Sequence, residues 1–339
     1  MKKYLMGPLA VVFLLAGCGE EESAGGSDET TGSSDDTVHL TFATTNDDSG
    51  ITAAMREHFD ERITELSDGS IEVEYFMGGQ LGGENEQLSQ MEAGEIDLGM
   101  GVLHADAYYP EYNAINVPFL FKDFEAMQKF IDDDMRQQIN EKAIEEGGIR
   151  TLGMQSYGGR WVTSNKPFSN PEELEGLKIR MPEFETWIPV FEELGALPTP
   201  ISASEIVSAL QTGTVDAQEN TLNNIVGRQM WEYQDYAIDV GHIEAVYEFL
   251  VSEKTWQDKL NENQQNALEE AVQDTVDYLA DIVEEENKEF VKTIEEEGME
   301  IIEVDKEEFR QAAMPATDEI VETMLAPGLE EDIEEANQD

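Results

Sequence analysis

The residues best suited to bind a charged small molecule are Arg180 and Asn220. Arg180 ends a short apolar stretch that predicts a strand, and Pro182 follows it closely. A guanidinium fixed at a strand end presents a rigid set of donors that can bind a carboxylate with two hydrogen bonds. A second predicted strand delivers Gln218, Glu219 and Asn220, and an amide from there can orient the same ligand. The pattern therefore indicates a carboxylate-binding site.

Other motifs that could carry chemistry do not complete a site. The four histidines show no spacing typical of metal ligands, and no Ser-His-Asp or Cys-His arrangement is visible. The acidic run at 132–134 lacks the loop spacing of an EF-hand. The paired glycines at 78–79 and 82–83 lack the lysine of a phosphate-binding loop. We therefore expect no catalytic residue, no metal site and no cofactor.

The charge balance indicates the surroundings of the protein. The chain has 75 acidic against 20 basic residues, a formal net charge of −55, and the acids are spread along its length. Such a surface repels itself in dilute buffer, whereas salt screens the repulsion. We therefore expect an extracellular protein of a salt-adapted, halophilic source. Nucleic acid is excluded as a partner because no basic stripe could meet its phosphates.

The N-terminus predicts export and a lipid anchor. A basic start is followed by the apolar stretch 5–16, which is too short to span a bilayer comfortably. This stretch ends in Leu-Ala-Gly-Cys, which resembles a bacterial lipobox, and Cys18 is the only cysteine. We expect 1–17 to be a lipoprotein signal peptide that is cleaved before a lipidated Cys18. Residues 18–37 are rich in acidic residues, glycine and serine, which predicts a disordered tether.

The rest of the chain alternates between predicted strands and helices. Strands are expected at 39–44, 71–76, 96–100 and 149–155, then at 177–181, 198–201, 215–218 and 246–252. Helices are expected at 52–66, 84–92, 124–146, 184–194 and 203–211, and a long acidic one at 261–297. This alternation predicts an α/β fold with a largely parallel sheet. Two similar sets follow each other, so we expect a ligand cleft between them at the carboxyl ends of the strands.

Several segments also resemble one known family. These are "GQLGGENEQLSQMEAGEIDLGMG", "NVPFLFKD", "IRTLGMQSYGGR", "GGRWVTSNKP", "GLKIRMP", "ELGALPTP" and "EIVSALQTGTVDAQEN". They are similar to elements of the DctP-type solute-binding subunits of TRAP (tripartite ATP-independent periplasmic) transporters, and they occur in the same order. The resemblance covers most of the chain from about Val38 onward.

The resemblance implies a two-lobed fold like that of periplasmic binding proteins, a Venus flytrap, with a long helix spanning both lobes. Lobe I would comprise residues 38–157 and 246–285, and lobe II residues 158–245 and 286–339. The implied protein is extracytoplasmic and works with TRAP membrane permease subunits.

The resemblance also implies roles for four residues. Arg180 matches the arginine that forms the principal salt bridge to the ligand carboxylate. Asn220 matches the asparagine of the family's D-G-Q-E-N-P element, which reads DAQENT here, so its glycine and proline are both replaced. Arg160 matches an arginine that contacts or frames the same carboxylate, or it only ties the lobes together by an ion pair. Trp187 is a candidate for the pocket wall, although a tryptophan in an α/β domain is more often part of the core.

The function we expect is capture of an organic acid anion and its delivery to the permease, without catalysis. Candidate ligands are C4-dicarboxylates, 2-oxo acids, sugar acids and zwitterionic osmolytes such as ectoine. The segments 44–48 and 102–106 are expected to contact the part of the ligand beyond the carboxylate. The alternatives are an ectoine-type binding protein of the same fold, an exported α/β enzyme that uses the cleft, and a structural surface lipoprotein.

Overall fold

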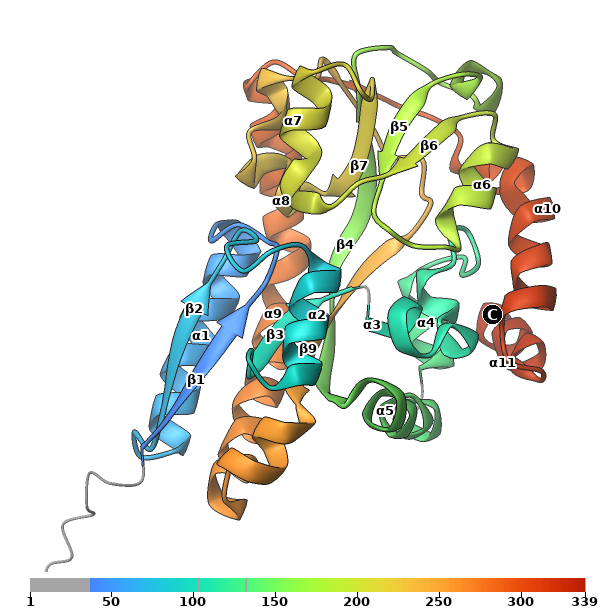
Figure 1. The fold of residues 1–339 in the computed structure, drawn as a ribbon. Helices are drawn as coiled ribbons and strands as arrows, with labels where there is room; N and C mark the ends of the chain where they lie inside the picture. Colours follow the sequence, from blue (N-terminus) through green and yellow to red (C-terminus); the bar gives the residue numbers. More distant parts are fainter. Residues whose placement is uncertain (1–36, 103, 132, 339) are drawn as a thin grey trace, which may run out of the picture. The chain divides into compact units, whose positions relative to one another are not determined.

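The described residues form one mixed sheet of ten strands (Figure 1). Eight of them follow the order β2-β1-β3-β9-β4-β7-β5-β6, while β8 pairs with β4 and β10 pairs with β8. The computed structural model describes residues 37–102, 104–131 and 133–338. The predicted signal peptide, Cys18 with its predicted lipid and nearly all of the predicted tether lie outside these residues. The strands are β1 (Val38–Ala43), β2 (Ile71–Phe76), β3 (Leu98–Gly101), β4 (Ile149–Ser164), β5 (Lys178–Met181), β6 (Leu197–Pro200), β7 (Ala217–Thr221), β8 (Tyr236–Ile238), β9 (Glu244–Ser252) and β10 (Glu300–Ile302).

The sheet is parallel toward its two edges and antiparallel in its middle. β1 pairs in parallel with β2 and β3, and β5 pairs in parallel with β6 and β7. Between these groups, β9 is antiparallel to β3 and β4, and β4 is antiparallel to β7 and β8. The expectation of a largely parallel sheet therefore holds only outside the central strands. Hydrophobic periodicity identifies a strand but not the direction of its neighbour.

The long strand β4 belongs to both halves of the sheet. Its first part pairs with β9, the register shifts between Ser156 and Gly159, and its last part pairs with β7 and β8. Gly158, at the shift, has a φ of 91°, and a Cβ there would lie 2.3 Å from Nδ2 of Asn287. A glycine is thus required where one strand passes from the first half of the sheet to the second.

The long helix α9 (Glu262–Glu296) packs against β4, against α1 (Gly50–Leu66) and against α8 (Leu222–Gly227) (Figure 1). Its start is fixed by a capping box, in which Asn261 accepts from the backbone of Gln264 and the Gln264 side chain accepts from that of Asn261. Its buried side chains recur at helical spacing: Ala267, Leu268, Ala271, Val272, Thr275, Leu279, Val283, Phe290 and Ile294. The predicted long helix is confirmed to within one residue at each end.

The remaining α-helices are α2 (Glu84–Ala93), α3 (His104–Tyr108), α4 (Phe124–Phe130), α5 (Asp133–Gly147), α6 (Trp187–Glu193), α7 (Ile206–Gln211), α10 (Lys306–Met324) and α11 (Leu329–Asn337). The chain also forms 3₁₀ turns at Pro110–Tyr112, Ala114–Asn116, Pro171–Leu174, Ala203–Glu205 and Met230–Glu232, and a π turn at Thr255–Lys259.

Three predicted helices differ from the structure. The helix expected at 203–211 begins with the 3₁₀ turn Ala203–Glu205, and α7 starts only at Ile206. The helix expected at 124–146 is divided into α4 and α5, because Ile131 at the end of α4 has the non-helical angles φ −87° and ψ 61°. The helix expected from Phe184 begins only at Trp187, and the preceding Thr186 gives it no side-chain cap.

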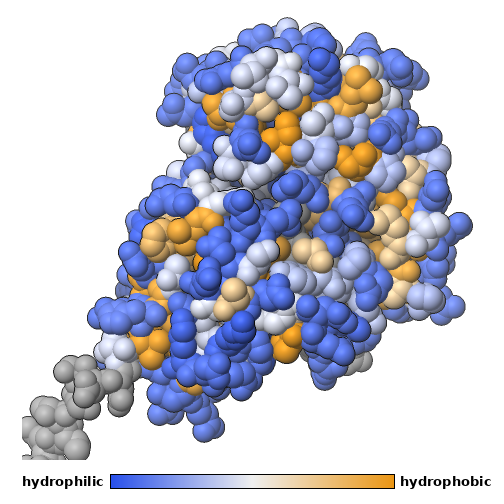
Figure 2. All heavy atoms as spheres, in the orientation of Figure 1, coloured by the Kyte–Doolittle hydropathy of each residue, from blue (hydrophilic) through white to orange (hydrophobic). Residues whose placement is uncertain are grey.

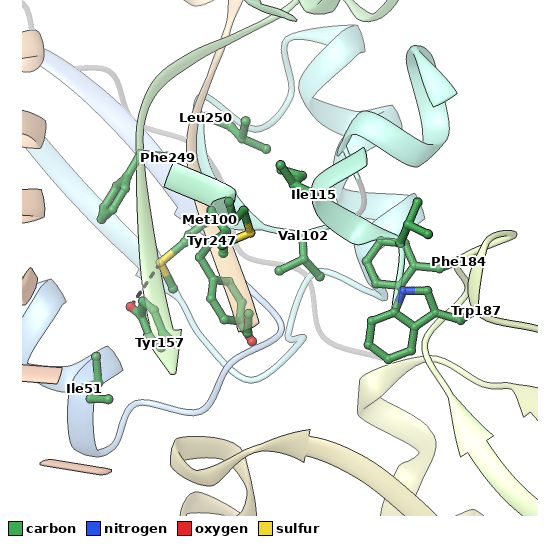
Figure 3. Close-up of a cluster of buried hydrophobic side chains, with 14 of the residues drawn as sticks. Ile51, Met100, Val102, Ile115, Tyr157, Phe184, Trp187, Tyr247, Phe249 and Leu250 are labelled. Atoms are coloured by element: carbon green, nitrogen blue, oxygen red, sulfur yellow. Dashed lines mark hydrogen bonds between the residues drawn. The ribbon is translucent and has the colours of Figure 1, made fainter. Parts of the chain in front are cut away.

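The core around the middle of the sheet is rich in aromatic side chains (Figure 3). Tyr157 on β4 and Tyr247 on β9 lie with ring centroids 4.5 Å apart, and the hydroxyl of Tyr157 contacts the sulfur of Met100 on β3. Phe184 and Trp187 stack on each other at 5.1 Å. The visible surface is mainly hydrophilic (Figure 2). Within the described residues, no helix combines the length and hydrophobicity needed to cross a membrane.

Candidate ligand-binding site

The centre of the candidate site is the carboxylate of Glu219 on β7, which is fully buried. Arg160 on β4 binds it with both ends of its guanidinium, at 2.5 Å from Nε to Oε2 and 2.9 Å from Nη2 to Oε1. Nε2 of His242 lies 3.2 Å from Oε2. Burial alone would raise the pKa of Glu219, but Arg160 and His242 outweigh that effect and lower it to about 2. Glu219 is therefore a carboxylate at neutral pH.

The sheet explains why two arginines reach one carboxylate. β7 lies between β4 and β5, which carry Arg160 and Arg180. Arg180 pairs in register with Gln218, the neighbour of Glu219, and Val162 of β4 pairs with Glu219 itself. All five residues of β7 are buried. The arginine side chains therefore converge on a strand from which water is excluded.

Arg180 is buried but only partly satisfied. It is 2% exposed, and its Nε donates to the carbonyl oxygen of Ile201 at 2.7 Å. Its Nη1 lies 3.7 Å from Oε1 of Glu219, an ion pair beyond hydrogen-bond distance. Within the described part of the chain, neither terminal nitrogen of Arg180 makes a hydrogen bond. Burial, together with the charges of Arg160 and Arg228, lowers the pKa of Arg180 to about 9, so it remains a cation at neutral pH.

The indole ring of Trp187, the first residue of α6, packs against the guanidinium of Arg160. The guanidinium carbon of Arg160 lies 5.4 Å from the centre of the indole ring, a cation–π distance. The ring is 1% exposed, and its Nε1 donates to the carbonyl oxygen of Asn116 at 2.7 Å. Because the indole packs against Phe184, Phe191 and His242, it belongs to the aromatic core and reaches the site through Arg160.

Asn220 belongs to an amide network beside the two arginines. Its Oδ1 accepts from Nδ2 of Asn224 at 3.0 Å, and its Nδ2 lies 3.4 Å from Oε1 of Gln218. Nδ2 of Asn224 also contacts Oδ1 of Asn46 and the hydroxyl of Tyr247. Asn220 makes no hydrogen bond to Arg160 or Arg180 among the described residues. The network links β7 to the loop after β1.

Arg228 completes this side of the site. Its Nε donates to Oδ2 of Asp47 at 3.1 Å, and its Nη2 donates to the carbonyl oxygen of Thr45 at 3.0 Å. Its Nη1 is buried without a hydrogen-bond partner in the described regions, as are Nδ2 of Asn46 and Oδ1 of Asn224. Two donors, on Arg228 and Asn46, and one acceptor, on Asn224, thus remain available. Hydroxyl groups can bind all three, because a hydroxyl both donates and accepts hydrogen bonds.

The structure brings together most of the residues expected from the sequence. Arg160 and Arg180 meet at Glu219, Asn220 lies one residue further along β7, and Asn46 falls within the segment 44–48. In the segment 102–106, the backbone nitrogen of Val102 donates to Oε1 of Glu84 at 2.6 Å.

Sequence reasoning placed Glu219 beside Asn220 but gave it no role, and it missed three further residues of the candidate site: Asn224, Arg228 and Tyr247. Glu219 had one recognisable signal, since a carboxylate on a buried strand must be paired. That signal is weak in a chain with 75 acidic residues, because burial of one of them is not visible in the sequence. Nowhere in the described residues does a group of three or more His, Cys, Asp or Glu side chains form a potential metal site.

Comparison with known proteins identifies the fold and the family. The profile of the DctP family, described as "Bacterial extracellular solute-binding protein, family 7", matches residues 42–324. A solute-binding protein of Roseobacter denitrificans is 31% identical over 76% of this chain and 79% of its own length. The sialic acid-binding periplasmic protein SiaP of Vibrio cholerae is 30% identical over 75% of this chain and 79% of its own length.

Solved structures show the same similarity. The Roseobacter protein, with bound L-galactonate, superposes with a TM-score of 0.82 and 28% identity, over 88% of this chain and 98% of that one. A TRAP solute-binding protein of Ochrobacterium anthropi, with bound L-fuconate, has a TM-score of 0.83 and 26% identity, over 89% of this chain and 100% of that one. The two-lobed α/β fold expected from the sequence is thereby confirmed. The chain belongs to the DctP family of bacterial extracellular solute-binding proteins and is a solute-binding protein of the TRAP transporter type.

Proposed function

We propose that this protein binds a hydroxylated monocarboxylate, a sugar acid, through Arg180 and delivers it to TRAP membrane permease subunits. The observation that carries the proposal is the state of Arg180, a buried cation whose terminal nitrogens make no hydrogen bond within the described residues. A buried charged group left without partners costs free energy. A carboxylate that binds both nitrogens removes this cost, and the guanidinium geometry favours it.

Arg160, Asn220 and Trp187 have supporting roles in this proposal. Arg160 is already bound by Glu219, so it holds that carboxylate in place and adds positive charge beside the ligand. Asn220 orients the ligand from β7, and Trp187 forms the wall behind Arg160. Arg180 is thus the anchor, and the other three residues position it and the ligand.

The charges around Arg180 favour one carboxylate over two. Arg160 is paired with Glu219, and Arg228 is paired with Asp47. Arg180, by contrast, makes only one ion pair within the described residues, with Glu219 at 3.7 Å. A monoanion balances it, whereas a dicarboxylate would bring a second charge into a buried site, where desolvation is costly. The unpartnered atoms of Asn46, Asn224 and Arg228 would bind ligand hydroxyl groups.

Some related proteins bind ligands of this class, whereas others, such as the C4-dicarboxylate-binding periplasmic protein DctP of Rhodobacter capsulatus, bind dicarboxylates. The relatives with bound L-galactonate and L-fuconate both hold sugar acids. The alternatives of an ectoine-type ligand and of an exported enzyme have no comparable support. We propose binding without turnover.

We also propose that the two lobes are 38–157 with 246–285, and 158–245 with 286–339, so that β4 passes between them at its register shift. With these boundaries, the hydrogen bonds from Asn224 to Asn46 and from Arg228 to Asp47 join the lobes across the site. Closure would exclude water and strengthen the ion pair with the ligand.

Arg180 is the first target for mutation. We expect galactonate or fuconate to stabilise the wild-type protein by about 2.7 kcal/mol at a hundred times its Kd. In Arg180→Ala, affinity should fall on the order of 100-fold, since charge-assisted hydrogen bonds are lost. Arg180→Lys should bind with intermediate affinity because it keeps the charge but not the planar geometry. Thermal-shift titration in about 2 M NaCl measures these effects, with self-repulsion screened.

Arg136→Ala is the matched control, because this arginine lies on α5 and the only hydrogen bond of its side chain among the described residues goes to the carbonyl oxygen of Ile131. Succinate and ectoine complete the ligand panel, and chromatography of the recovered ligand tests for turnover. Undiminished sugar-acid binding by Arg180→Ala, or conversion of the ligand, would contradict the proposal.

Glu219 should stabilise the fold as well as the site. We expect Glu219→Gln to lower the free energy of unfolding by about 3–5 kcal/mol at pH 7, because Arg160 loses its buried counter-charge. The folded-state pKa lies below the usual 4.5, so this stabilisation is complete above pH 4.5 and disappears as the pH falls toward about 2. Denaturant titrations of both proteins across this range should converge at the acid end.

Glu284→Gln on α9 serves as the control, since that carboxylate is 84% exposed. It should leave the free energy of unfolding nearly unchanged at pH 7. A difference between wild type and Glu219→Gln that is small at pH 7, or constant from pH 7 to pH 2, would show that Glu219 is not held as a buried carboxylate.

We further propose that the mature protein is anchored to the extracytoplasmic face of the membrane through lipidated Cys18. The support is the lipobox-like sequence before this cysteine. When the full chain is expressed in a bacterium, it should partition into the Triton X-114 phase, and Cys18→Ser should move to the aqueous phase. Mass spectrometry should place the mature N-terminus at Cys18. Aqueous partitioning of the wild type would contradict the anchor.

The formal charge of −55 supports adaptation to salt. Since the Debye length falls from about 10 Å at 0.1 M to about 3 Å at 1 M, salt should relieve repulsion between surface carboxylates. We expect the Tm to rise from about 0.1 M to about 2 M NaCl, more than in sucrose solutions, which stabilise proteins without screening charge. A Tm that is highest in dilute buffer would contradict salt adaptation.

A further inference from the structure

A cavity of about 780 Å³ lies beside the candidate sugar-acid site, and His242, which contacts Glu219, is among its lining residues. Its lining comes from the segment 115–128, from β4 at its register shift, from 239–244, from α9 and from the start of α10. None of the four expected ligand residues, Arg180, Asn220, Arg160 and Trp187, is among the lining residues. Its volume is within the range of small-molecule sites, about 300–1,000 Å³.

Arg310 on α10 lines this cavity and is unusual because it has no partner among the described residues. It makes no hydrogen bond and no ion pair within the described residues, and its Nε is buried. The chain has 75 acidic residues, so an arginine without a carboxylate partner is unexpected. A buried donor without a partner costs free energy, and a bound anion would remove that cost.

Asn287 on α9 adds an acceptor to the same cavity. Its Nδ2 donates to the carbonyl oxygen of Tyr157 at 3.1 Å, which fixes the amide, while its Oδ1 is buried without a partner among the described residues. His242 also lines the cavity and is only 1% exposed. Its Nδ1 is buried and has no hydrogen-bond partner among the described residues. Arg310, Asn287 and His242, each with a buried side-chain atom that lacks a partner in the described residues, thus all line this one cavity.

The rest of the lining is divided between apolar and charged side chains. The apolar part includes Ile115, Phe119, Leu120, Ile243, Val283 and Val291. The three lysines of the lining, including Lys122, already have partners: Lys288 pairs with Glu284 and Lys306 with Asp239. Lys288, Glu284 and Lys306 are each more than half exposed, so this part of the lining faces solvent. Arg310 is therefore the cation of the lining whose charge an entering anion can best compensate.

We propose that this cavity is a second binding site, for a small amphipathic monocarboxylate. The carboxylate binds Arg310, and the apolar body packs against the side chains of the segment 115–120 and of α9. A hydroxyl group on the ligand can donate to Oδ1 of Asn287. The required ligand differs in chemistry from a sugar acid because the cavity offers an extended apolar wall.

The test uses octanoate below its micellar concentration as the probe and Arg180→Ala as the background, so that the first site lacks its carboxylate anchor. Octanoate should raise the Tm of this variant and bind with one-to-one stoichiometry in calorimetry. 1-Octanol, which lacks the charge, and butanoate, which lacks most of the apolar body, should each bind at least tenfold more weakly.

Two further substitutions in the same background locate the site. Arg310→Gln should weaken octanoate binding about tenfold or more, whereas Arg136→Gln should leave it unchanged. Ala280→Phe, at an exposed position of the lining on α9, should block binding by filling the cavity, with Arg310 intact. Circular dichroism verifies that each variant is folded.

Absence of octanoate binding in the Arg180→Ala background, or full binding by Arg310→Gln, would overturn the second site. Neither result bears on sugar-acid binding, which is measured on the Arg180 series. Conversely, failure of sugar acids to bind the wild type leaves the octanoate test intact, so the two proposals fail separately.

Discussion

The buried carboxylate of Glu219 is the interaction on which the candidate site depends. It lies on β7, and the strands on either side carry the two arginines that it attracts. Without it, two guanidinium groups would be buried together with no counter-charge, which would strongly lower the free energy of unfolding. The two arginines bind it unequally, since Arg160 donates two short hydrogen bonds to its oxygens and Arg180 makes only a long ion pair. This inequality leaves Arg180 in position and still able to bind an anion.

The framework around Glu219 explains how distant segments reach one place. β4 pairs first with β9 and then with β7, so one strand connects the half of the sheet that contains β1 to the half that contains Arg180. The long helix α9 packs along β4 and also contacts α1 and α8. Residues of the loop after β1, such as Asn46, therefore meet Asn224 of α8 across the site. A fold in which few elements join the two halves suits a protein that opens and closes around its ligand.

Much of this arrangement could be predicted from the sequence, where the signal is local. Strand ends and turn residues placed Arg180, Asn220 and most elements within a few residues of their positions, and the long helix was predicted almost to its limits. The direction of β9 and the full length of β4 were not predictable, because they depend on pairing between distant segments. The break at Ile131 was also missed, since the apolar pattern continues through it. Glu219 was placed on its strand but given no role, because burial, which makes it unusual among the acids, is a property of the folded chain.

A crystal structure of the protein with bound galactonate tests the central claim most directly. The account predicts that the ligand carboxylate lies about 2.7–2.9 Å from both terminal nitrogens of Arg180, the distance of a charge-assisted pair. Glu219 should remain bound to Arg160, and ligand hydroxyls should meet Asn46 or Asn224. A carboxylate bound away from Arg180, with Glu219 released from Arg160, would contradict it.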